Sequence, residues 1–392
     1  MTLKIKTMNK ISPKGLGLFG DKYAISDAEA APDAILVRSA QVDTDLFPGT
    51  LAVARAGAGV NNITIDKASR VGMCVFNTPG ANANAVAELV FIGLGLALRN
   101  VAKALTWMDT IRDIADAKEM DEKVEKGKSQ FAGSELAGKT LGVIGLGKIG
   151  VLASNWALAF GMKVVAYEPF PSPQNMHRLS RNVIVTNNLS EVFAQADFLT
   201  VHVPLNDKTK GLLNAATLAS FNGSVILNFS RGAIVDNEVI KARLTAGSLR
   251  AYVTDFPSPS IVKVPGVIAL PHLGASTEEA EENCATMAVE QLRDYLEFGI
   301  VKNSVNFPAI DGHPAANARV RLVVISQDVP SMIAEITRVI GSAGINIHSF
   351  KNESNGKIGY NLIDTEADVD VTVVEQLTKI DKVIFVRKIA LT

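Results

Sequence analysis

The sequence contains little cysteine, no excess of either charge and no long uninterrupted hydrophobic run. Cys74 and Cys284 are the only cysteines among 392 residues, which excludes a disulfide-stapled module and fits a reducing compartment, so we expect a cytoplasmic protein. Thirty-nine basic residues are balanced by 40 acidic ones, for a formal net charge of −1. The bulk charge therefore gives no reason to expect binding to nucleic acid or to an anionic membrane.

The hydrophobic segments do not predict membrane insertion. The longest of them, residues 83–98, is interrupted by Asn84 and Glu88 and is shorter than the ~20 residues that a bilayer-spanning helix requires. We predict a buried helix there. The opening residues MTLKIKTMNK alternate polar and apolar side chains, which predicts a strand rather than a secretory signal. We also predict no metal site.

Two series of short apolar runs, separated by helical segments, indicate an α/β architecture. The first series predicts strands at Leu3–Met8, Ala34–Val37, Leu51–Ala54 and Cys74–Phe76. The second predicts strands at Thr140–Ile144, Lys163–Tyr167, Phe198–Val203, Ser224–Asn228, Ala251–Thr254 and Val267–Leu270. This alternation is typical of doubly wound parallel sheets. Between the two series, the charged segment Asp109–Lys128 predicts a solvated helix or a subunit-contact arm.

The last part of the chain predicts a separate, smaller module. A long helix is expected over Glu278–Phe298, and residues 306–318 have the proline, glycine and small side chains of a linker. Beyond the linker the pattern is strand, helix, two strands, helix, strand. This βαββαβ order predicts a ferredoxin-like module that is appended to the rest of the chain.

A glycine-rich turn after the first strand of the second series predicts a dinucleotide site. Gly145 permits a tight turn, Gly147 allows the backbone to approach a pyrophosphate, and Gly150 allows close packing of helix on strand. Glu168 ends the next predicted strand, where a carboxylate accepts hydrogen bonds from the ribose hydroxyls and repels a 2′-phosphate. The pattern therefore predicts NAD rather than NADP, although Glu168 alone could also be a solvated acid at a strand end.

Two side chains at strand ends of the same sheet suggest oxidoreductase chemistry. Hydride transfer between a nicotinamide and a C2 carbonyl needs a group that exchanges the hydroxyl proton, and His272 suits that role. It also needs a cation for the substrate carboxylate, and Arg231 offers a bidentate fork. Taken singly, an arginine at a strand end is more often a surface cation, and a histidine is more often a polar residue with its hydrogen bonds satisfied. Their expected place on one sheet edge, beside a nucleotide loop, favours catalysis.

Longer stretches of the chain resemble the D-isomer-specific 2-hydroxyacid dehydrogenase family. These stretches are Val37–Ala40, Ala54–Ile63, Asn77–Asn82, Val86–Glu88, the turn that begins at Gly145, Ser230–Gly232 and Pro271–Thr277. The resemblance implies two doubly wound (Rossmann-like) domains, with an NAD-binding domain at 99–286 inserted into a substrate-binding domain at 1–98 and 287–310. The ferredoxin-like module, at 318–392, resembles an ACT domain.

The resemblance also implies which residues touch ligands. The substrate's phosphate or carboxylate would meet a set of residues at the ends of the first strands: Arg38, Ser39, Arg55, Gly57 and Ala58. Cofactor contacts would include the glycines and Glu168 together with Lys148, Ile149, Val203, Phe229, Arg231, Asp255, His272 and Gly274.

One position departs from the family pattern. Members of the family have a catalytic glutamate in the run Asp-Val-Phe-x-x-Glu-Pro, whereas here the run from Asp255 reads Asp-Phe-Pro-Ser-Pro-Ser and ends at Ser260. A carboxylate beside an imidazole orients it and raises its pKa. Either Asp255 takes over as the partner of His272, or the histidine works with a weaker partner.

The implied activity is NAD-dependent oxidation of 3-phospho-D-glycerate to 3-phosphohydroxypyruvate, the first step of L-serine biosynthesis. Arg38, Arg55 and the ACT-like module favour this phosphorylated substrate. A related D-2-hydroxyacid dehydrogenase or hydroxypyruvate reductase is the alternative, and a non-catalytic NAD-sensing protein is a third. An amino-acid effector would bind the ACT-like module, where Asn346 alone matches the serine-binding pattern. The arm and this module together predict a homodimer or homotetramer.

Overall fold

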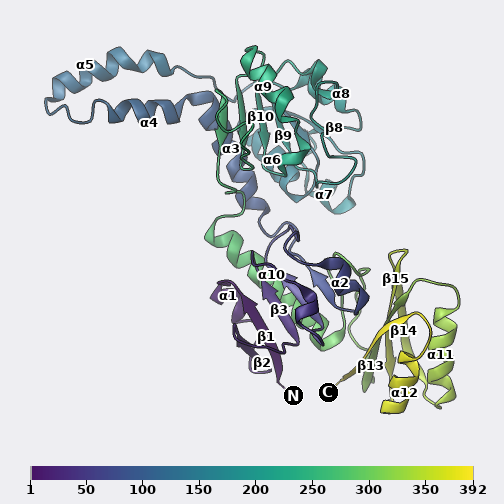
Figure 1. Ribbon diagram of the computed structural model, residues 1–392. Helices are drawn as coiled ribbons and strands as arrows, with labels where there is room; N and C mark the ends of the chain where they lie inside the picture. The colour runs from purple at the N-terminus through teal and green to yellow at the C-terminus, as the bar shows by residue number, and fades with distance from the viewer. Residues whose placement is uncertain (1, 392) are drawn as a thin grey trace. The chain divides into compact units, whose positions relative to one another are not determined.

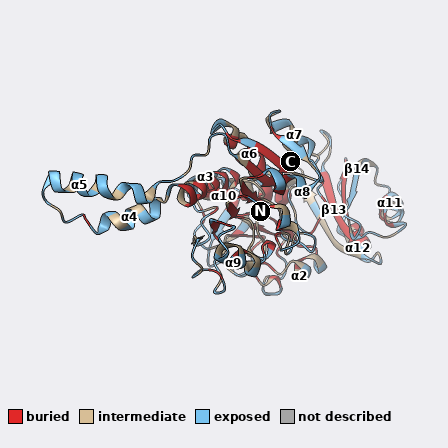
Figure 2. Ribbon diagram, turned by 90° about the horizontal axis from the view of Figure 1, so that it is seen from above, coloured by how far each residue is buried: buried red, intermediate tan, exposed pale blue. Residues whose placement is uncertain are grey.

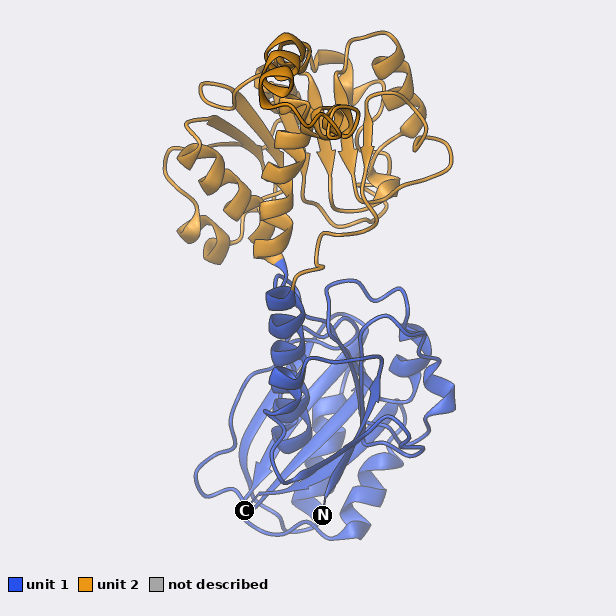
Figure 3. Cartoon of the chain, turned by 90° about the vertical axis from the view of Figure 1, so that its left-hand side faces the viewer, with its two compact units in different colours: residues 1–82, 278–392 blue, residues 83–277 orange. Residues whose placement is uncertain are grey.

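The chain forms two compact units in a computed structural model that describes residues 2–391 (Figure 3). Unit 1 combines Met1–Asn82 with Glu278–Thr392, and unit 2 is the intervening segment Ala83–Thr277. The C-terminal module therefore belongs to the same compact unit as the first sheet. The domain boundaries expected from the sequence remain a prediction.

Unit 2 is built on a seven-stranded parallel sheet in the order β12-β11-β10-β9-β6-β7-β8. Its strands are β6 (Thr140–Ile144), β7 (Lys163–Tyr167), β8 (Ile184–Thr186), β9 (Phe198–Val201), β10 (Val225–Asn228), β11 (Ala251–Thr254) and β12 (Val267–Ala269). The strand order reverses beside β6, so the carboxyl end of β6 lies at the switch point where open α/β sheets bind ligands. The predicted doubly wound fold is confirmed.

Helices cover both faces of this sheet (Figure 1). On one face, α3 (Ala83–Arg99) and α6 (Lys148–Ala159) share a hydrophobic core with alternate residues of the strands. On the other face, α8 (Leu189–Gln195) and α9 (Asn237–Thr245) do the same. The central strands β6, β9, β10 and β11 are thus buried on both sides, which explains why they are continuous apolar runs in the sequence. The buried helix predicted at 83–98 is α3.

A helical arm extends from the body of unit 2 (Figure 1). Its helices α4 (Val101–Asp109) and α5 (Ala117–Gly127) have no buried residue, and Figure 2 shows them mostly exposed. The Trp107 ring joins them, since it packs against Gly127 and lies 5.5 Å from the ring of Phe131. Within the described residues, no single helix is long and apolar enough to span a membrane, although α3 and α4 together reach that length across a 63° bend.

The first sheet of unit 1 is also parallel, in the order β2-β1-β3-β4-β5. Its strands are β1 (Leu3–Met8), β2 (Tyr23–Ser26), β3 (Ala34–Val37), β4 (Ala52–Arg55) and β5 (Cys74–Phe76). One face packs on α1 (Pro13–Leu16) and α10 (Glu278–Phe298). The other face packs on α2 (Ile65–Arg70) and the loops beside it.

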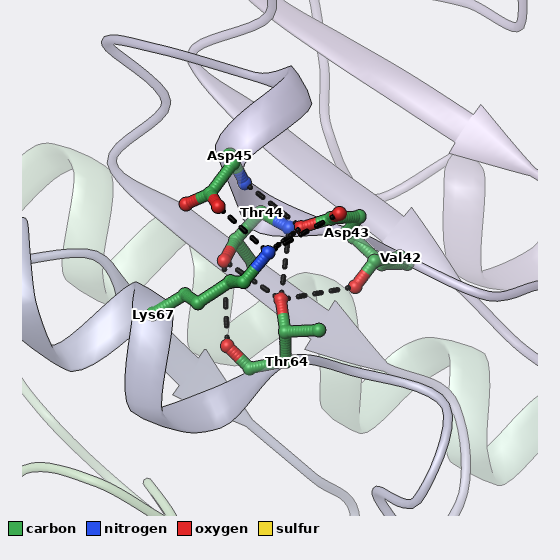
Figure 4. A network of polar contacts seen from close by, with 6 residues as sticks. All are labelled: Val42, Asp43, Thr44, Asp45, Thr64 and Lys67. Carbon is green, nitrogen blue, oxygen red and sulfur yellow. Dashed lines mark hydrogen bonds and ion pairs between the residues drawn. The ribbon is translucent and has the colours of Figure 1, made fainter.

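A polar network fixes the loop that follows β3 (Figure 4). The Lys67 ammonium on α2 lies 3.1 Å from Asp43 and 2.7 Å from Asp45. Below it, the hydroxyls of Thr44 and Thr64 are 2.9 Å apart, and the Thr44 N–H also donates to the Thr64 hydroxyl. The network holds the loop after β3 against the loop that leads into α2.

The C-terminal module is a four-stranded antiparallel sheet in the order β14-β15-β13-β16. Its elements are β13 (Val320–Gln327), α11 (Met332–Ser342), β14 (Ile347–Ser354), β15 (Ile358–Thr365), α12 (Val371–Thr378) and β16 (Val383–Ala390). The predicted βαββαβ order is confirmed. Both helices cover one face of the sheet, with Leu322 and Val324 of β13 beneath them.

The other face of this sheet packs on the core beside α10. Val323 and Tyr360 join the cluster that contains the buried side of α10. Arg321 is 1% exposed and forms two hydrogen bonds with Asp364, at 2.6 and 2.8 Å, while it also donates to the carbonyls of Phe298 and Gly312. The module is therefore built into unit 1, whereas the sequence suggested that it was appended.

Most predicted elements are present, with small differences at their ends. Two short strands, β2 and β8, were not predicted from the sequence. Residues of both are largely exposed, so they lack the apolar run that identifies a buried strand. The charged segment after residue 109 includes α5, as expected for a solvated helix.

The buried ion pair generates a first prediction. Asp364→Asn leaves the Arg321 charge buried without a counter-charge, so we expect unit 1 to lose about 3–5 kcal/mol of stability in urea unfolding followed by tyrosine fluorescence. Glu335→Gln is the matched control, because it removes the exposed partner of Arg338 on α11 of the same module and should cost less than about 1 kcal/mol. Equal losses in the two variants would show that the buried pair is not a major constraint.

Candidate functional site

The glycine turn after β6 has the geometry that a dinucleotide requires. Gly145 has a φ of 96°, and a Cβ there would lie 2.6 Å from the carbonyl oxygen of His202. A Cβ at Gly150 would lie 1.9 Å from the carbonyl oxygen of Gly145. Both positions therefore exclude any larger residue. At Gly147, by contrast, a Cβ would meet nothing within 4 Å, so the backbone before α6 is open to a ligand.

The start of α6 adds an anion-binding element. Gly147 is the N-cap of this helix, and no side chain forms a capping hydrogen bond there. The first N–H groups of a helix and its dipole favour a negatively charged ligand. Ile149 is partly buried and packs against the core beneath the helix, and its contact with the cofactor stays a prediction. These features fit the pyrophosphate of NAD.

Glu168 follows β7 and is fixed by two backbone N–H groups. Its carboxylate accepts from Leu146 at 2.8 Å and from Phe170 at 3.0 Å. The first of these bonds ties the glycine turn to the end of β7. Each carboxylate oxygen has a second lone pair, so Glu168 keeps acceptor capacity for ribose hydroxyls.

His202 and Val203, after β9, form the far wall of the glycine turn. A Cβ at Gly145 would lie 2.8 Å from the Val203 side chain. The His202 ring shares a hydrogen bond of 2.9 Å with the Thr200 hydroxyl, and its Nδ1 is buried without a partner. Burial lowers the pKa of His202 to about 3, so the ring is neutral at physiological pH.

Arg231 follows β10 and is held at its backbone. Its carbonyl accepts from the Asn228 amide at 2.9 Å, and its guanidinium donates to the Ser230 carbonyl at 2.6 Å. Ser230 in turn donates to the carbonyl of Val201 on β9. Arg231 as a whole is half-buried. The neighbouring Phe229 is 6% exposed and its ring packs against Gly93 of α3, so its side chain belongs to the core.

Asp255 and His272 lie on neighbouring strand ends. Asp255 follows β11 and is 1% exposed. Its carbonyl accepts the His272 N–H at 3.0 Å, and its carboxylate accepts the Gly274 N–H at 2.9 Å. Asp255 therefore clamps the backbone on both sides of the loop that carries His272. This loop is under conformational constraint, because His272 has a φ of 48°, in the left-handed region.

The His272 ring has an aromatic neighbour rather than a carboxylate. It lies 4.8 Å, centroid to centroid, from the ring of Phe256. No carboxylate within residues 2–391 forms a hydrogen bond or ion pair with the ring. At the position where the family has its glutamate, the Ser260 hydroxyl lies 2.9 Å from that of Ser258 and 3.3 Å from the Asn237 amide.

The second oxygen of Asp255 is buried without a hydrogen bond. Burial raises the pKa of Asp255, and the opposing effects of the Gly274 N–H and of His272 do not cancel it. Such a group is costly to keep ionised, and groups of this kind are frequent in functional sites.

The candidate anion-binding residues of unit 1 also lie together. Arg38 follows β3, and its carbonyl accepts a hydrogen bond of 2.9 Å from Arg55, the last residue of β4. The Arg55 guanidinium lies against Gly57, where a Cβ would come within 2.1 Å of Nη1. Ser39 is exposed, and its N–H donates to Asn9.

Sequence reasoning did not identify Glu281, which pairs with Arg38 at 2.5 Å. Glu281 lies in the first turn of α10, and both side chains are about 40% exposed. It belongs to a run of acidic residues that has no distinctive spacing, so only the structure singles it out. The Ala58 carbonyl, also expected near the substrate, accepts from the Asn77 amide at 2.6 Å.

Comparisons with known proteins agree with this geometry. Residues 103–274 match the family described as D-isomer specific 2-hydroxyacid dehydrogenase, NAD binding domain. The chain is 35% identical to the hydroxypyruvate reductase of Thermotoga maritima over 283 residues, which are 68% of this chain and 85% of that protein.

Relatives described as D-3-phosphoglycerate dehydrogenase match a shorter share of their own length. The Bacillus subtilis protein is 36% identical over 289 residues, which cover 71% of this chain and 52% of that protein. The chain thus spans about half the length of the first such relatives. An NAD⁺-bound 3-phosphoglycerate dehydrogenase of Entamoeba histolytica is similar in structure, with a TM-score of 0.61 and 26% identity over 78% of this chain and 99% of that one.

Asp255 generates a prediction about stability and pH. The pKa of this carboxyl is higher in the folded protein than in the unfolded chain, where it is ~3.9. Its contribution to stability is therefore fully present below the unfolded pKa, where the group is protonated. The contribution is lost as the pH rises through the folded-state pKa. Asp255→Asn should therefore raise the thermal midpoint of unfolding at pH 7, and the gain should vanish toward pH 4.

Asp368 provides a control of opposite sign. A hydrogen bond from Lys388 lowers the pKa of this exposed carboxyl, so its stabilising contribution exists above the unfolded pKa and is lost as the pH falls. Asp368→Asn should slightly lower the midpoint at pH 7. A lower midpoint at pH 7 for the Asp255 variant would contradict the assignment of a buried, strained carboxylate.

Proposed function

The chain belongs to the D-isomer-specific 2-hydroxyacid dehydrogenase family, and we propose that it oxidises 3-phospho-D-glycerate to 3-phosphohydroxypyruvate with NAD. The observation that supports this chemistry is the placement of Arg231 after β10 and of His272 after β12, on either side of β11 at one edge of the sheet. The switch point of the same sheet has a dinucleotide turn. Serine biosynthesis is the pathway in which this reaction takes part.

The proposed roles follow from the chemistry of each side chain. Arg231 binds the substrate carboxylate and polarises the C2 oxygen, because its guanidinium is a rigid bidentate donor. His272 accepts the hydroxyl proton during oxidation and returns it during reduction. The bound nicotinamide supplies the hydride acceptor. Asp255 acts on the loop of His272 through the backbone, so its role as a hydrogen-bond partner of the imidazole remains a prediction.

The phosphate preference rests on the cations of unit 1. Arg38 and Arg55 end neighbouring parallel strands, and Gly57 brings a flexible backbone beside the Arg55 guanidinium. Two guanidinium groups at one sheet edge suit a doubly charged phosphate better than an uncharged hydroxyl. Glu168 supports NAD over NADP, because its carboxylate would repel a 2′-phosphate.

The similarity to a hydroxypyruvate reductase makes that activity the second candidate. Arg231 and His272 would have the same roles in that reaction. The contacts of Arg38 and Arg55 would matter less, because hydroxypyruvate has no phosphate. A non-catalytic NAD-binding role is the third, and the missing glutamate is its support.

We also propose that the arm and its surroundings contact a second copy of the chain. Large apolar side chains are exposed there, among them Ile92 at 55% on α3, Leu105 at 63% on α4 and Phe160 at 52% after α6. Exposed apolar side chains gathered in one region mark interaction surfaces. Binding of an amino-acid effector near Asn346 and a cytoplasmic location remain predictions.

The activity is tested by NADH consumption with micromolar protein and three substrates: phosphohydroxypyruvate, hydroxypyruvate and pyruvate. We expect phosphohydroxypyruvate to give the highest kcat/KM. His272→Asn should lower kcat by about 10²–10⁴-fold while NADH fluorescence still reports binding. A preference for hydroxypyruvate would support hydroxypyruvate reductase activity. NADH binding without turnover of any of the three substrates would refute the hypothesis that the protein is an enzyme.

The Arg38–Glu281 pair generates a second kinetic prediction. Glu281 competes with the substrate phosphate for Arg38, so Glu281→Gln should lower the KM for phosphohydroxypyruvate by about 1.5–5-fold, the range for an exposed ion pair. The KM for hydroxypyruvate, which has no phosphate, should not change. Glu282→Gln is the matched control, because Glu282 is the next residue of α10 and pairs with Lys14 instead. Equal effects of the two variants would refute a specific role for Glu281.

A further inference from the structure

One aromatic ring lies beside both proposed catalytic side chains. The Phe256 ring centroid is 4.8 Å from that of His272, with 51° between the ring planes. The Cζ atom of Arg231 lies 5.9 Å from the same centroid. All three residues follow adjacent strands of one sheet in unit 2. The ring therefore touches the imidazole and faces the guanidinium from a single fixed position.

The backbone that carries Phe256 is firmly held. The Phe256 N–H donates to the Thr254 hydroxyl at 3.1 Å, and this hydroxyl donates to the Asn228 carbonyl at 3.0 Å. Thr254 is fully buried. On the other side of Phe256, the loop is fixed by hydrogen bonds between Asn237 and the hydroxyls of Ser258 and Ser260. Hydrogen bonds therefore fix the backbone on both sides of the residue that carries the phenyl ring.

His272 needs such a support because its own side chain is exposed. Asp255 fixes the backbone of the loop, but backbone bonds do not determine the rotation of an imidazole about its side-chain torsions. In a histidine paired with a carboxylate, a hydrogen bond to one ring nitrogen fixes that rotation. Here an aromatic contact takes its place, and offset or tilted ring pairs of this separation are attractive.

We propose that Phe256 is a positioning residue that orients the His272 imidazole and the Arg231 guanidinium in place of the missing glutamate. The inference rests on the proposed dehydrogenase function of the same residues. It implies that both side chains lose their shared orientation when the ring is removed, although neither loses a hydrogen bond. The loss would appear in kcat, because misorientation of reacting groups affects the chemical step.

The direct test does not depend on turnover. Protein labelled with ¹³C at histidine Cε1 gives signals for the five histidines, and His272→Asn identifies the signal of His272. A ring at 4.8 Å shifts that signal, so Phe256→Leu should move it and leave the other four unchanged. Phe256→Tyr, which keeps the ring, should leave it near its original position. An unmoved His272 signal in the leucine variant would overturn the proposal.

Kinetics provide the second measurement. Phe256→Leu should lower kcat for phosphohydroxypyruvate by about 10–100-fold, with the KM for NADH within about twofold, and Phe256→Tyr should restore most of the activity. Phe221→Leu is the control, because the Phe221 ring also lies beneath an arginine in unit 2. That arginine, Arg243, donates its hydrogen bonds to the carbonyls of Leu218 and Phe221 and not to the site residues. The Phe221→Leu variant should leave kcat unchanged.

The outcomes separate the two hypotheses. If the His272 signal shifts in Phe256→Leu but the wild-type protein turns over no 2-keto acid, the ring contact is supported and the dehydrogenase function is rejected. Normal kcat in Phe256→Leu, in an enzyme that the wild-type assay has shown to be active, would reject the positioning role alone.

Discussion

Parallel strand pairing is the constraint on which the candidate site of unit 2 depends. In the register of this sheet, Asn228 pairs with Thr254, and Thr254 pairs with Ala269. Residues that follow these three strands must therefore emerge side by side at one edge. Arg231, Asp255 and His272 are separated by many residues in the chain, yet the register alone brings them to that edge. The specific contacts among them refine a placement that the backbone has already made.

Unit 1 depends on a different constraint, the burial of α10 between two sheets. The helix packs on the first sheet through Ala288 and Leu292, and the C-terminal module covers it through Val323 and Tyr360. The sheet of the C-terminal module is covered by α11 and α12 on one face and by α10 on the other, so the module cannot move as an independent body. Any effect of a ligand at the module would have to pass through this shared core, and Glu281 lies at the first turn of the same helix.

Local sequence patterns predicted the parts of the site that depend on local geometry. The glycine turn, Glu168, Arg231 and His272 each follow an apolar run, so their places at strand ends could be deduced from the sequence. Glu281 and Phe256 could not be found in this way, because their importance comes from contacts with residues distant in the chain. The docking of the C-terminal module was also missed. Strand β13 contains the continuous apolar run Leu-Val-Val-Ile beside the buried Arg321, whereas a half-exposed strand would alternate apolar and polar residues.

The absent glutamate does not leave the polar groups of the unit 2 site without restraint. The site residues are held by backbone bonds and packing: Asp255 through two N–H groups, His272 through a phenyl ring, Arg231 through carbonyl and amide contacts. Such restraints do not require additional charges, and they leave the half-buried Arg231 and the exposed His272 accessible to a substrate. The cost is local instability, because Asp255 remains buried with one oxygen unpaired. A fold selected for stability alone would replace that carboxylate, so its retention favours a functional reason.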